Sequence, residues 1–409
     1  MKEMLIPLQI RRIIEKYKNI TKIVKLSDLG KFYKGKGIAN CDIKNSGLPC
    51  ITYGQLYTEF NGTIKDVSTY INSNTAKNSV LIHKNDILFP SSGETIEEIG
   101  KASVNLVDEP LYAGGDIIVF TPNIDVNSRY LTFLLNSDVY RAQARRFGQG
   151  HSVVHIYTEP LGEIILPILP FEEQKLIADI LSTWDHAIEL RRELSNFYKM
   201  QYKFLLNSLT KNVFSRDSDW DKIKLKKIMK EESIKSTQNN EYEILSSTKN
   251  DIYKQSEYFN RQVASKSNIG YKILNKKRIV MSPQNAWMGN VNYNDKYEVG
   301  LVSPSYKIFK LLNVSEDYFK HLIKSHRFIH HIDSYSEQGA SIVRKNLSID
   351  EFLNSYISLP NIEMQKKYGH ILDLIDIKIK KNEELLDFLK NQKKGLMQRL
   401  LTGQVRVQV

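Results

Sequence analysis

Residues 169–209 read LPFEEQKLIADILSTWDHAIELRRELSNFYKMQYKFLLNSL, and residues 359–400 read LPNIEMQKKYGHILDLIDIKIKKNEELLDFLKNQKKGLMQRL. The segments align at an offset of 191 residues, with identical pairs such as Glu172/Glu363 and Gln174/Gln365. Apolar residues recur in both at spacings of three and four, and no proline interrupts them, which predicts two long amphipathic helices. So narrow an apolar stripe favours a helix that pairs with another helix. Arg191 and Asn382 interrupt the stripes at equivalent positions, either to fix the register of the pair or as a solvated stutter.

The stretches ahead of these helices, residues 21–170 and 212–360, are similar in length and poor in long helical periodicity. Near its end each has a Tyr-rich helical segment followed by a Gly-x-Ser turn, GHSVVH from Gly150 and GASIVR from Gly339. Between these landmarks the two stretches hardly resemble each other. The chain therefore reads as an α+β protein with two mixed α/β domains related by an internal repeat, each followed by a long helix. We expect an N-terminal segment (1–20), a first domain (21–170), a first helix (171–211), a second domain (212–360), and a second helix with a tail (361–409).

Composition narrows the class of protein. The 409 residues suffice for two to three domains, and no apolar run approaches the roughly 20 residues that span a bilayer. Two cysteines and the absence of a secretory signal favour a reducing, cytoplasmic location. The net charge of +12 fits a nucleic-acid-binding protein, although a compositional bias toward lysine explains it equally well.

Motifs for catalysis are incomplete. GKFYKGKG from Gly30 resembles a phosphate-binding loop, but Gly37 stands where a hydroxyl residue is needed. The chain has no Pro-Pro, so the tetrapeptide with which adenine methyltransferases hold their target is absent. His326 and His330 lie one helical turn apart, yet no nearby Cys or carboxylate completes a metal site. We therefore expect no catalytic residue, no metal and no cofactor in this chain.

Residues suited to nucleic-acid recognition occur in both domains. In the second, Lys277 and Arg278 precede a loop containing Gln284, Asn285 and Trp287. Asn and Gln pair bidentately with adenine, and Arg or Lys binds guanine or phosphate. The alternative to DNA contact is that each of these residues belongs to an ordinary surface loop or packs in the domain. For Trp287, packing is favoured.

In the first domain, the counterpart is the loop of Ser91, Ser92, Gly93 and Glu94, where a glutamate could accept from a cytosine amine. Further candidate DNA-contacting residues are basic or lie in the Gly-x-Ser turns. They are Lys31, Lys34 and Lys36, expected in one loop; Arg141, Arg145 and Arg146, expected in one helix; and His151, Ser152, Arg327, Ser341 and Arg344.

Several motifs together resemble one known family. They are the openings LPFEEQK and LPNIEMQK, the helix segments ILSTWDHAI and ILDLIDIKI, the ending KGLMQRLLTGQVRV, and the blocks SSGETIEEIGKA and YAGGDIIVFTP. On these residues the chain resembles the specificity subunit of type I restriction-modification systems. The departures are local: Asn361, Ile362 and Met364 alter the second opening, and Gly369 and His370 replace the usual small and acidic pair.

The resemblance implies two target recognition domains, each reading one half of a split, asymmetric site in double-stranded DNA. It also implies that the two helices pair as an antiparallel coiled coil, which sets the spacing of the half-sites and docks two methylation subunits. S-adenosylmethionine, ATP and magnesium would then belong to partner subunits, and this chain would be non-catalytic. Whether restriction or translocase subunits also bind is left open. The rival hypothesis is a coiled-coil adaptor whose domains bind proteins, with binding far less sensitive to salt than binding to phosphates.

Overall fold

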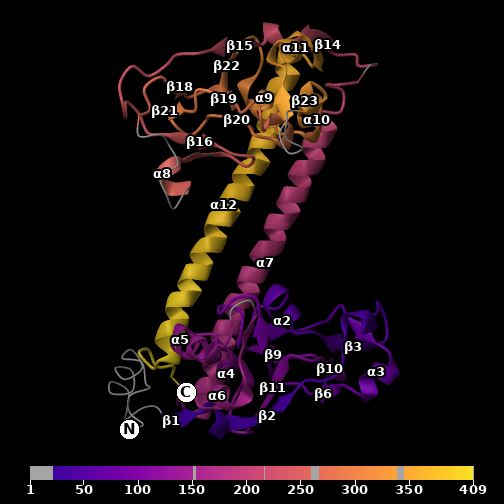
Figure 1. Cartoon of the computed structure of the whole chain (residues 1–409), viewed down its shortest axis with the longest axis vertical. Helices are drawn as coiled ribbons and strands as arrows, with labels where there is room; N and C mark the ends of the chain where they lie inside the picture. Colours follow the sequence, from indigo (N-terminus) through magenta and orange to yellow (C-terminus); the bar gives the residue numbers. More distant parts are fainter. Residues whose placement is uncertain (1–21, 151–152, 216, 259–266, 339–344, 409) are drawn as a thin grey trace. The chain divides into compact units, whose positions relative to one another are not determined.

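The structure is a computed structural model that describes residues 22–150, 153–215, 217–258, 267–338 and 345–408. The chain divides into two compact units, which we describe separately. Unit 1 comprises residues 1–190 and 386–409, and unit 2 comprises residues 191–385. Two long helices, α7 (Phe171–Leu209) and α12 (Ile362–Leu401), each contribute residues to both units (Figure 1). In the described part of the chain, no helix combines the length and hydrophobicity needed to cross a membrane.

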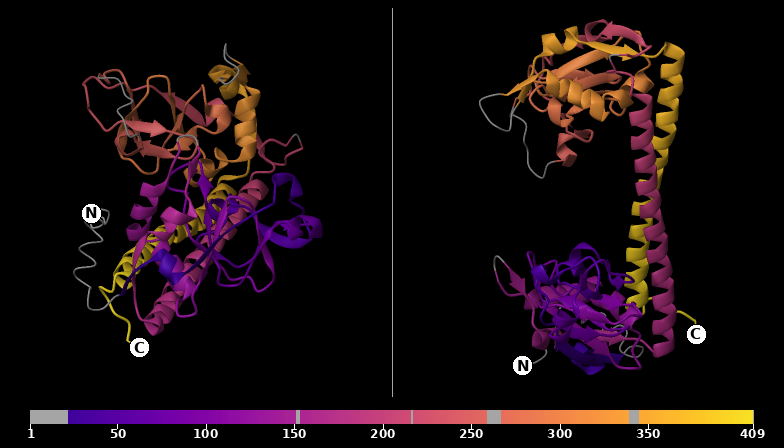
Figure 2. Two further views of the ribbon diagram at one scale, coloured as in Figure 1. Left: turned by 60° about the horizontal axis from the view of Figure 1, so that its bottom comes forward. Right: turned by 90° about the vertical axis from the view of Figure 1, so that its right-hand side faces the viewer.

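The two long helices lie side by side within each unit (Figures 1 and 2). In unit 1, Ile177 and Leu181 of α7 share a hydrophobic cluster with Leu400 of α12, and Lys393 Nζ lies 2.5 Å from Asp185 Oδ1. In unit 2, Asn382 Nδ2 donates to Arg191 O at 2.9 Å. Further along α7, Lys378 Nζ lies 5.9 Å from the ring centre of Tyr198. Because the α12 partner falls in number as the α7 residue rises, the contacts are antiparallel.

Unit 1 contains two sheets. The first has the order β2–β11–β7–β9–β4, antiparallel except for β4 with β9. Its strands are β2 (Gly30–Lys34), β11 (Ile117–Pro122), β7 (Ile87–Pro90), β9 (Ser103–Asn105) and β4 (Thr63–Ile64). The second has the order β5 (Tyr70–Ile71), β3 (Leu48–Ile51), β10 (Leu111–Ala113) and β6 (Val80–Ile82). Two short pairs complete the unit: β1 (Lys22–Lys25) with β13 (Ile165–Ile168), and β8 (Ser92–Gly93) with β12 (Val154–His155).

The helices of unit 1 are α2 (Gln55–Thr58), α3 (Ser73–Lys77), α4 (Ser128–Leu135), α5 (Asp138–Ala144) and α6 (Thr158–Gly162). Short 3-10 turns are η2 (Leu26–Leu29), η3 (Asn40–Asp42) and η4 (Arg145–Phe147). The largest core cluster joins Phe89 and Phe120 of the first sheet to Tyr130 of α4 and to the two long helices. The first turns of α7 and the last turns of α12 are thus part of this core.

Unit 2 contains one larger sheet and several two-stranded pairs. The sheet is antiparallel, with the order β15 (Met229–Glu232), β22 (Lys307–Leu311), β19 (Arg278–Met281) and β20 (Val291–Tyr293). The pairs are β14 (Asp221–Lys224) with β25 (Tyr356–Leu359), β16 (Leu245–Ser247) with β17 (Ile252–Lys254), β18 (Lys272–Asn275) with β21 (Val299–Val302), and β23 (Ser336–Gln338) with β24 (Lys345–Leu347). The helices are α8 (Gln255–Tyr258), α9 (Glu316–Leu322), α10 (His326–Ser334) and α11 (Ile349–Asn354), with 3-10 turns η5 (Leu225–Lys227) and η6 (Ala286–Met288).

One buried glutamine in each unit fixes the start of a long helix. Gln174 Oε1 accepts from Asn127 N at 2.9 Å, and its Nε2 donates to Leu169 O at 2.8 Å. Asn127 is the residue that caps α4. The same amide therefore holds the first turn of α7, the strand before it and the beginning of α4.

Gln365 makes the corresponding contacts in unit 2. Its Oε1 accepts from Ser315 N at 3.0 Å, and its Nε2 donates to Pro360 O at 2.8 Å. Ser315 caps α9, so the helix that is held has the same place in its unit. Both glutamines are buried, where an unpaired amide would be costly.

We predict that Gln365→Leu lowers the free energy of unfolding of unit 2 by about 2–4 kcal/mol, because Ser315 N–H and Pro360 O lose a buried partner. Gln201→Leu, on the exposed side of α7, is the matched control and should change stability by less than about 0.5 kcal/mol. Urea unfolding measures both. Equal midpoints for the two variants would show that the buried amide does not anchor the helix.

Candidate nucleic-acid interface

The candidate loop of unit 2 directly follows β19 and is held by backbone hydrogen bonds. Ser282 N donates to Asn290 O at 3.1 Å, and Met288 N donates to Asn285 O at 3.1 Å. Gly289 has a φ of +98°, a left-handed conformation that glycine adopts readily. The loop is therefore closed by η6 and a tight turn.

The amide side chains of this loop are available to a ligand. Gln284 is exposed and Asn285 is half-buried. Within the described residues neither side chain has a hydrogen-bond partner, while Asn290 and Asn292 nearby are fully engaged with Ser247 and Thr248. Free amides on a fixed backbone suit hydrogen bonding to base edges.

Trp287 packs rather than projecting freely. Lys345 Nζ lies 5.0 Å from its ring centre and 2.5 Å from Asp333 Oδ1. The indole Nε1 is buried and has no hydrogen-bond partner among the described residues. This supports the packing alternative for Trp287.

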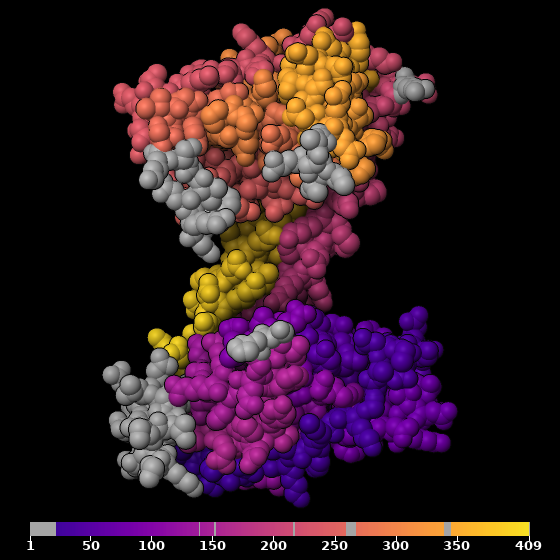
Figure 3. Space-filling view, in the orientation of Figure 1, coloured from indigo at the N-terminus to yellow at the C-terminus, as the bar shows by residue number. Residues whose placement is uncertain are grey.

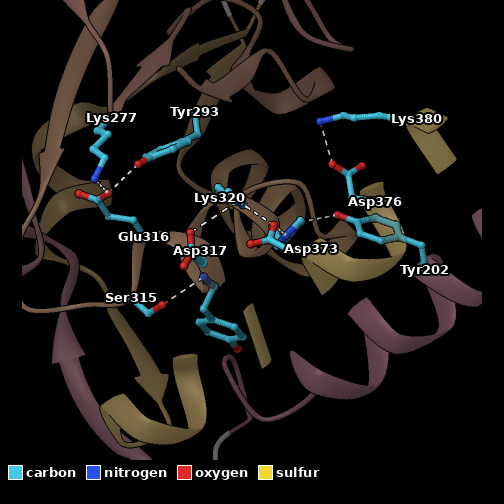
Figure 4. Close-up of polar contacts among 12 residues, drawn as sticks. Tyr202, Lys277, Tyr293, Ser315, Glu316, Asp317, Lys320, Asp373, Asp376 and Lys380 are labelled. Carbon is cyan, nitrogen blue, oxygen red and sulfur yellow. Dashed lines mark hydrogen bonds and ion pairs between the residues drawn. The ribbon is translucent and has the colours of Figure 1, made fainter. Parts of the chain in front are cut away.

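Acids within unit 2 neutralise the two basic residues before the loop (Figure 4 shows the first pair). Lys277 Nζ lies 3.5 Å from Glu316 Oε2, which also accepts from Tyr293 OH at 2.8 Å. Burial, together with Glu316, raises the pKa of Tyr293. Arg278 Nε donates to Glu232 Oε2 at 2.6 Å.

The candidate loop of unit 1 follows β7 and is mostly internal. Ser91, Ser92 and Gly93 are buried. Ser92 Oγ lies 2.9 Å from His155 Nδ1, and Ser91 O accepts from Ile156 N at 2.8 Å. Only Glu94 of the four candidates is exposed.

The two loops have equivalent places within their units. Each follows the third strand of a run, β2–β11–β7 in unit 1 and β15–β22–β19 in unit 2. In each, a later segment docks on the loop backbone: Ile156 N donates to Ser91 O, and Leu347 N donates to Pro283 O at 3.1 Å. Similar scaffolds therefore present chemically different loops.

The basic residues of unit 1 differ in part from expectation. Lys31 and Lys34 lie on β2, an edge strand, and not in a loop with Lys36, so that prediction is wrong. The strand forms because Phe32 packs on Phe120, with ring centres 4.7 Å apart, and β2 pairs with β11. All three lysines are exposed.

The three arginines are also divided between two elements. Arg141 is buried in α5, and its guanidinium donates to Ile99 O and Glu97 O, both at 2.7 Å. Burial lowers its pKa. Arg145 and Arg146 lie in the 3-10 turn η4 that follows α5, and both are exposed. Arg141 therefore holds the 97–99 backbone in place, whereas the other two face solvent.

The remaining candidates are Arg327, exposed in the first turn of α10, and four residues of the Gly-x-Ser turns. His151, Ser152, Ser341 and Arg344 lie outside the described residues. Over the ranges that the structure describes, no group of three or more His, Cys, Asp or Glu residues is arranged to hold a metal ion.

Sequence reasoning missed a polar junction in unit 2 that joins both long helices to α9 (Figure 4). His321, buried in α9, lies 2.8 Å from Tyr202 OH through Nδ1 and 2.8 Å from Asp373 Oδ1 through Nε2. Lys320 Nζ lies 2.7 Å from the same carboxylate oxygen. Burial lowers the pKa of His321 despite the favourable contact with Asp373. Tyr202 and Asp373 stand at polar positions of the helices, but only the fold brings His321 between them.

A second polar group of interest is the half-buried Lys324, which follows α9. Its Nζ donates to Lys249 O at 3.1 Å and to Asn292 Oδ1. Burial lowers the pKa of this lysine to about 8. It thus serves as a hydrogen-bond donor inside unit 2 rather than as a surface charge.

Comparison with known proteins fits this geometry. Residues 20–196 match the family described as the type I restriction modification DNA specificity domain. The type I restriction enzyme MjaVIII specificity subunit of Methanocaldococcus jannaschii is 24% identical over 418 residues, covering 94% of this chain and 93% of that protein.

Two solved structures share the fold. A type I restriction-modification S subunit from M. genitalium has a TM-score of 0.59 at 16% identity, covering 94% of this chain and 96% of the other. A chain from a structure described as showing complex assembly and conformational transition of the type I R-M system has a TM-score of 0.55 at 12% identity, covering 94% and 98%.

Residues 20–196, nearly all of them in unit 1, are thus similar to the DNA specificity domain of type I restriction-modification systems. Because the similarity to curated and solved subunits extends over nearly the whole chain, the resemblance to type I restriction-modification specificity subunits is confirmed.

The pH dependence of unit 2 tests the burial of α10. Burial and the neighbouring His330 lower the pKa of His331 to about 4, and its Nε2 lies 2.8 Å from Ser355 Oγ. The unfolded chain binds this proton near pH 6.5, so we predict that stability falls as the pH drops from about 6.5 to 4, by roughly 1–3 kcal/mol. His331→Gln should flatten this part of the curve of unfolding free energy against pH, whereas His370→Gln on exposed α12 should not. Parallel curves for wild type and His331→Gln would contradict the prediction.

Proposed function

We propose that this chain is the non-catalytic specificity subunit of a type I restriction-modification complex and reads a two-part, asymmetric DNA target, one half with each unit. The observation that carries the proposal is the pair of loops after β7 and β19, which have equivalent places but different side chains. Two similar scaffolds with unlike reading loops suit two unlike half-sites. The family match of unit 1 supports the DNA-binding role and does not favour the protein-binding adaptor.

Within this proposal, unit 2 reads its half-site through the free amides of Gln284 and Asn285, and unit 1 through the exposed Glu94. Lys31, Lys34, Lys36, Arg145 and Arg146 are exposed and suited to backbone phosphates. Arg141, Ser91 and Ser92 would support the surface from inside, because their polar atoms bond within unit 1.

The helices are proposed to dock two methylation subunits. Several large apolar side chains on α7 and α12 are exposed: Phe197, Met200 and Phe204 on α7, and Leu374, Ile377 and Phe388 on α12. Much of α12, in yellow, is uncovered in the view of Figure 3. Exposed apolar side chains in such number are typical of protein-binding surfaces. S-adenosylmethionine, ATP and magnesium would be held by the partner subunits.

The double substitution Gln284→Ala/Asn285→Ala should relax or abolish one half of the methylated motif, because the amides that pair with a base edge are lost. Mapping of adenine methylation across the genome, in cells that express the chain with the methylation subunit of its own operon, measures the motif. Lys226→Ala/Lys227→Ala, on exposed η5, is the matched control and should leave both halves intact. An unchanged motif in the amide variant would remove this loop from the reading surface.

Lengthening both helices tests the proposed spacer. Duplicating residues 188–194 of α7 together with 379–385 of α12 adds a heptad to two segments that face each other, since Arg191 contacts Asn382. Seven residues add about 10.5 Å, or roughly three base pairs of DNA. The gap between the two halves of the motif should lengthen by that amount, while each half keeps its sequence. A gap of unchanged length in a complex that still methylates would argue against a helical spacer.

A further inference from the structure

A basic cavity lies in unit 2 between α7 and α10. Its volume is about 670 Å³, and the residues that line it include Lys203 and Asn207 of α7 and His326, Arg327 and His330 of α10. Lys203 and Asn207 are four residues apart and share one face of α7. The apolar residues of α10, Phe328 and Ile332, point instead into the core of the unit.

Among the residues that the structure describes, the charges at this cavity lack acidic partners. None of its described lining residues is Asp or Glu, and neither Lys203 nor Arg327 makes an ion pair with them. Five other cations of unit 2, by contrast, lie beside acids: Lys277 by Glu316, Arg278 by Glu232, Lys307 by Glu231, Lys320 by Asp373 and Lys345 by Asp333. The cavity therefore brings together two cations, Lys203 and Arg327, that acids among the described residues do not neutralise.

The helix itself adds to this positive potential. His326 and Arg327 lie in the first turn of α10, whose nine residues begin after the capping residue Ser325. The partial positive charge of a helix N-terminus favours an anion there. The rings of His326 and His330 are stacked, with centres 6.4 Å apart and planes at 4°, so both edges reach the same side of α10.

We propose that this cavity binds a phosphate group of the DNA backbone next to the half-site that unit 2 reads. The proposal rests on the proposed function, and it assigns a positioning contact rather than a base contact. The phosphate oxygens would accept from Arg327 and Lys203, with the histidines and Asn207 as further donors.

Two observations favour a DNA strand over a free anion. Lys203, His326, Arg327 and His330 are all exposed, so the cavity admits a polymer and does not enclose a small ion. In addition, α10 packs on η6, the turn that closes the loop of Gln284 and Asn285. A phosphate held by α10 would therefore fix unit 2 on the DNA through the same element that supports its candidate reading loop.

The test uses the full chain in complex with its methylation subunit. Affinity is measured against salt concentration for a duplex that carries the methylated motif and for one of equal length that lacks it. For Lys203→Gln/Arg327→Gln we expect weaker binding to both duplexes, by a similar factor of about ten, and a slope of log K against log salt reduced by about 2. The methylated motif should not change.

Lys226→Gln/Lys227→Gln removes the same charge from exposed η5 and is the matched control for a general effect of net charge. If the two variants have equal affinities and slopes, the cavity does not bind DNA phosphate. If the cavity variant alters the motif instead of the slope, its residues read bases and the phosphate assignment is wrong.

Calorimetric titration of the complex with inorganic phosphate separates the two sources of the ligand. Suppose that the wild-type complex binds phosphate, that the cavity variant does not, and that the two have the same DNA affinity and salt slope. The cavity would then bind a free anion, and the proposal would be wrong. The methylated motif of the wild-type complex tests the proposed function: if no motif requires this chain, the proposed DNA reading is wrong. The salt slope on the duplex without the motif tests the cavity separately, because binding to phosphates does not depend on sequence. The two proposals can therefore fail independently.

Discussion

Gln174 and Gln365 each use a buried side-chain amide to hold three parts of a unit together. In unit 1 the amide links the segment before α7 to the capping residue of α4, and in unit 2 it links the segment before α12 to the capping residue of α9. Both ends of the amide are satisfied by backbone groups, so a residue of another shape would leave buried polar groups unpaired. The direction in which each long helix leaves its unit follows from this contact, and every proposal that treats the helices as a spacer depends on it.

The contact between Arg191 and Asn382 has a related meaning. These residues occupy equivalent positions of the two aligned segments, and Asn382 Nδ2 donates to Arg191 O. Equivalent positions of the two aligned segments therefore meet in the antiparallel contact between the helices. A buried asparagine at such a point favours one register over its neighbours, because a shift of the helices would leave its amide without a partner.

The sequence was informative where a pattern is long or repeated. The helices from residue 171 and residue 362 follow from apolar spacing and from the doubled LP-x-EEQK-like opening, because forty residues of periodicity leave little choice of structure. It was less informative for short strands: β2 includes Lys31 and Lys34, and this basic stretch is paired with β11 and held by the packing of Phe32 on Phe120. Arg141 shows the same limit within the site. Its charge suggested DNA contact, whereas burial against the 97–99 backbone, which depends on distant residues, directs it inward.

The distribution of charge connects these points to function. The second domain carries most of the basic excess of the two domains in the sequence, yet in the structure many of those cations pair with acids on adjacent strands and helices. Net charge therefore says little about where an anion binds, and the position of the unpaired charge says more. In unit 2, Arg327 of α10 and Lys203 on the facing side of α7 make no ion pair within the described residues, and the free amides of Gln284 and Asn285 lie on the loop that α10 supports. If the proposed phosphate contact and the proposed reading loop both hold, they depend on one helix, so a change in the packing of α10 would alter both the affinity for DNA and the choice of sequence.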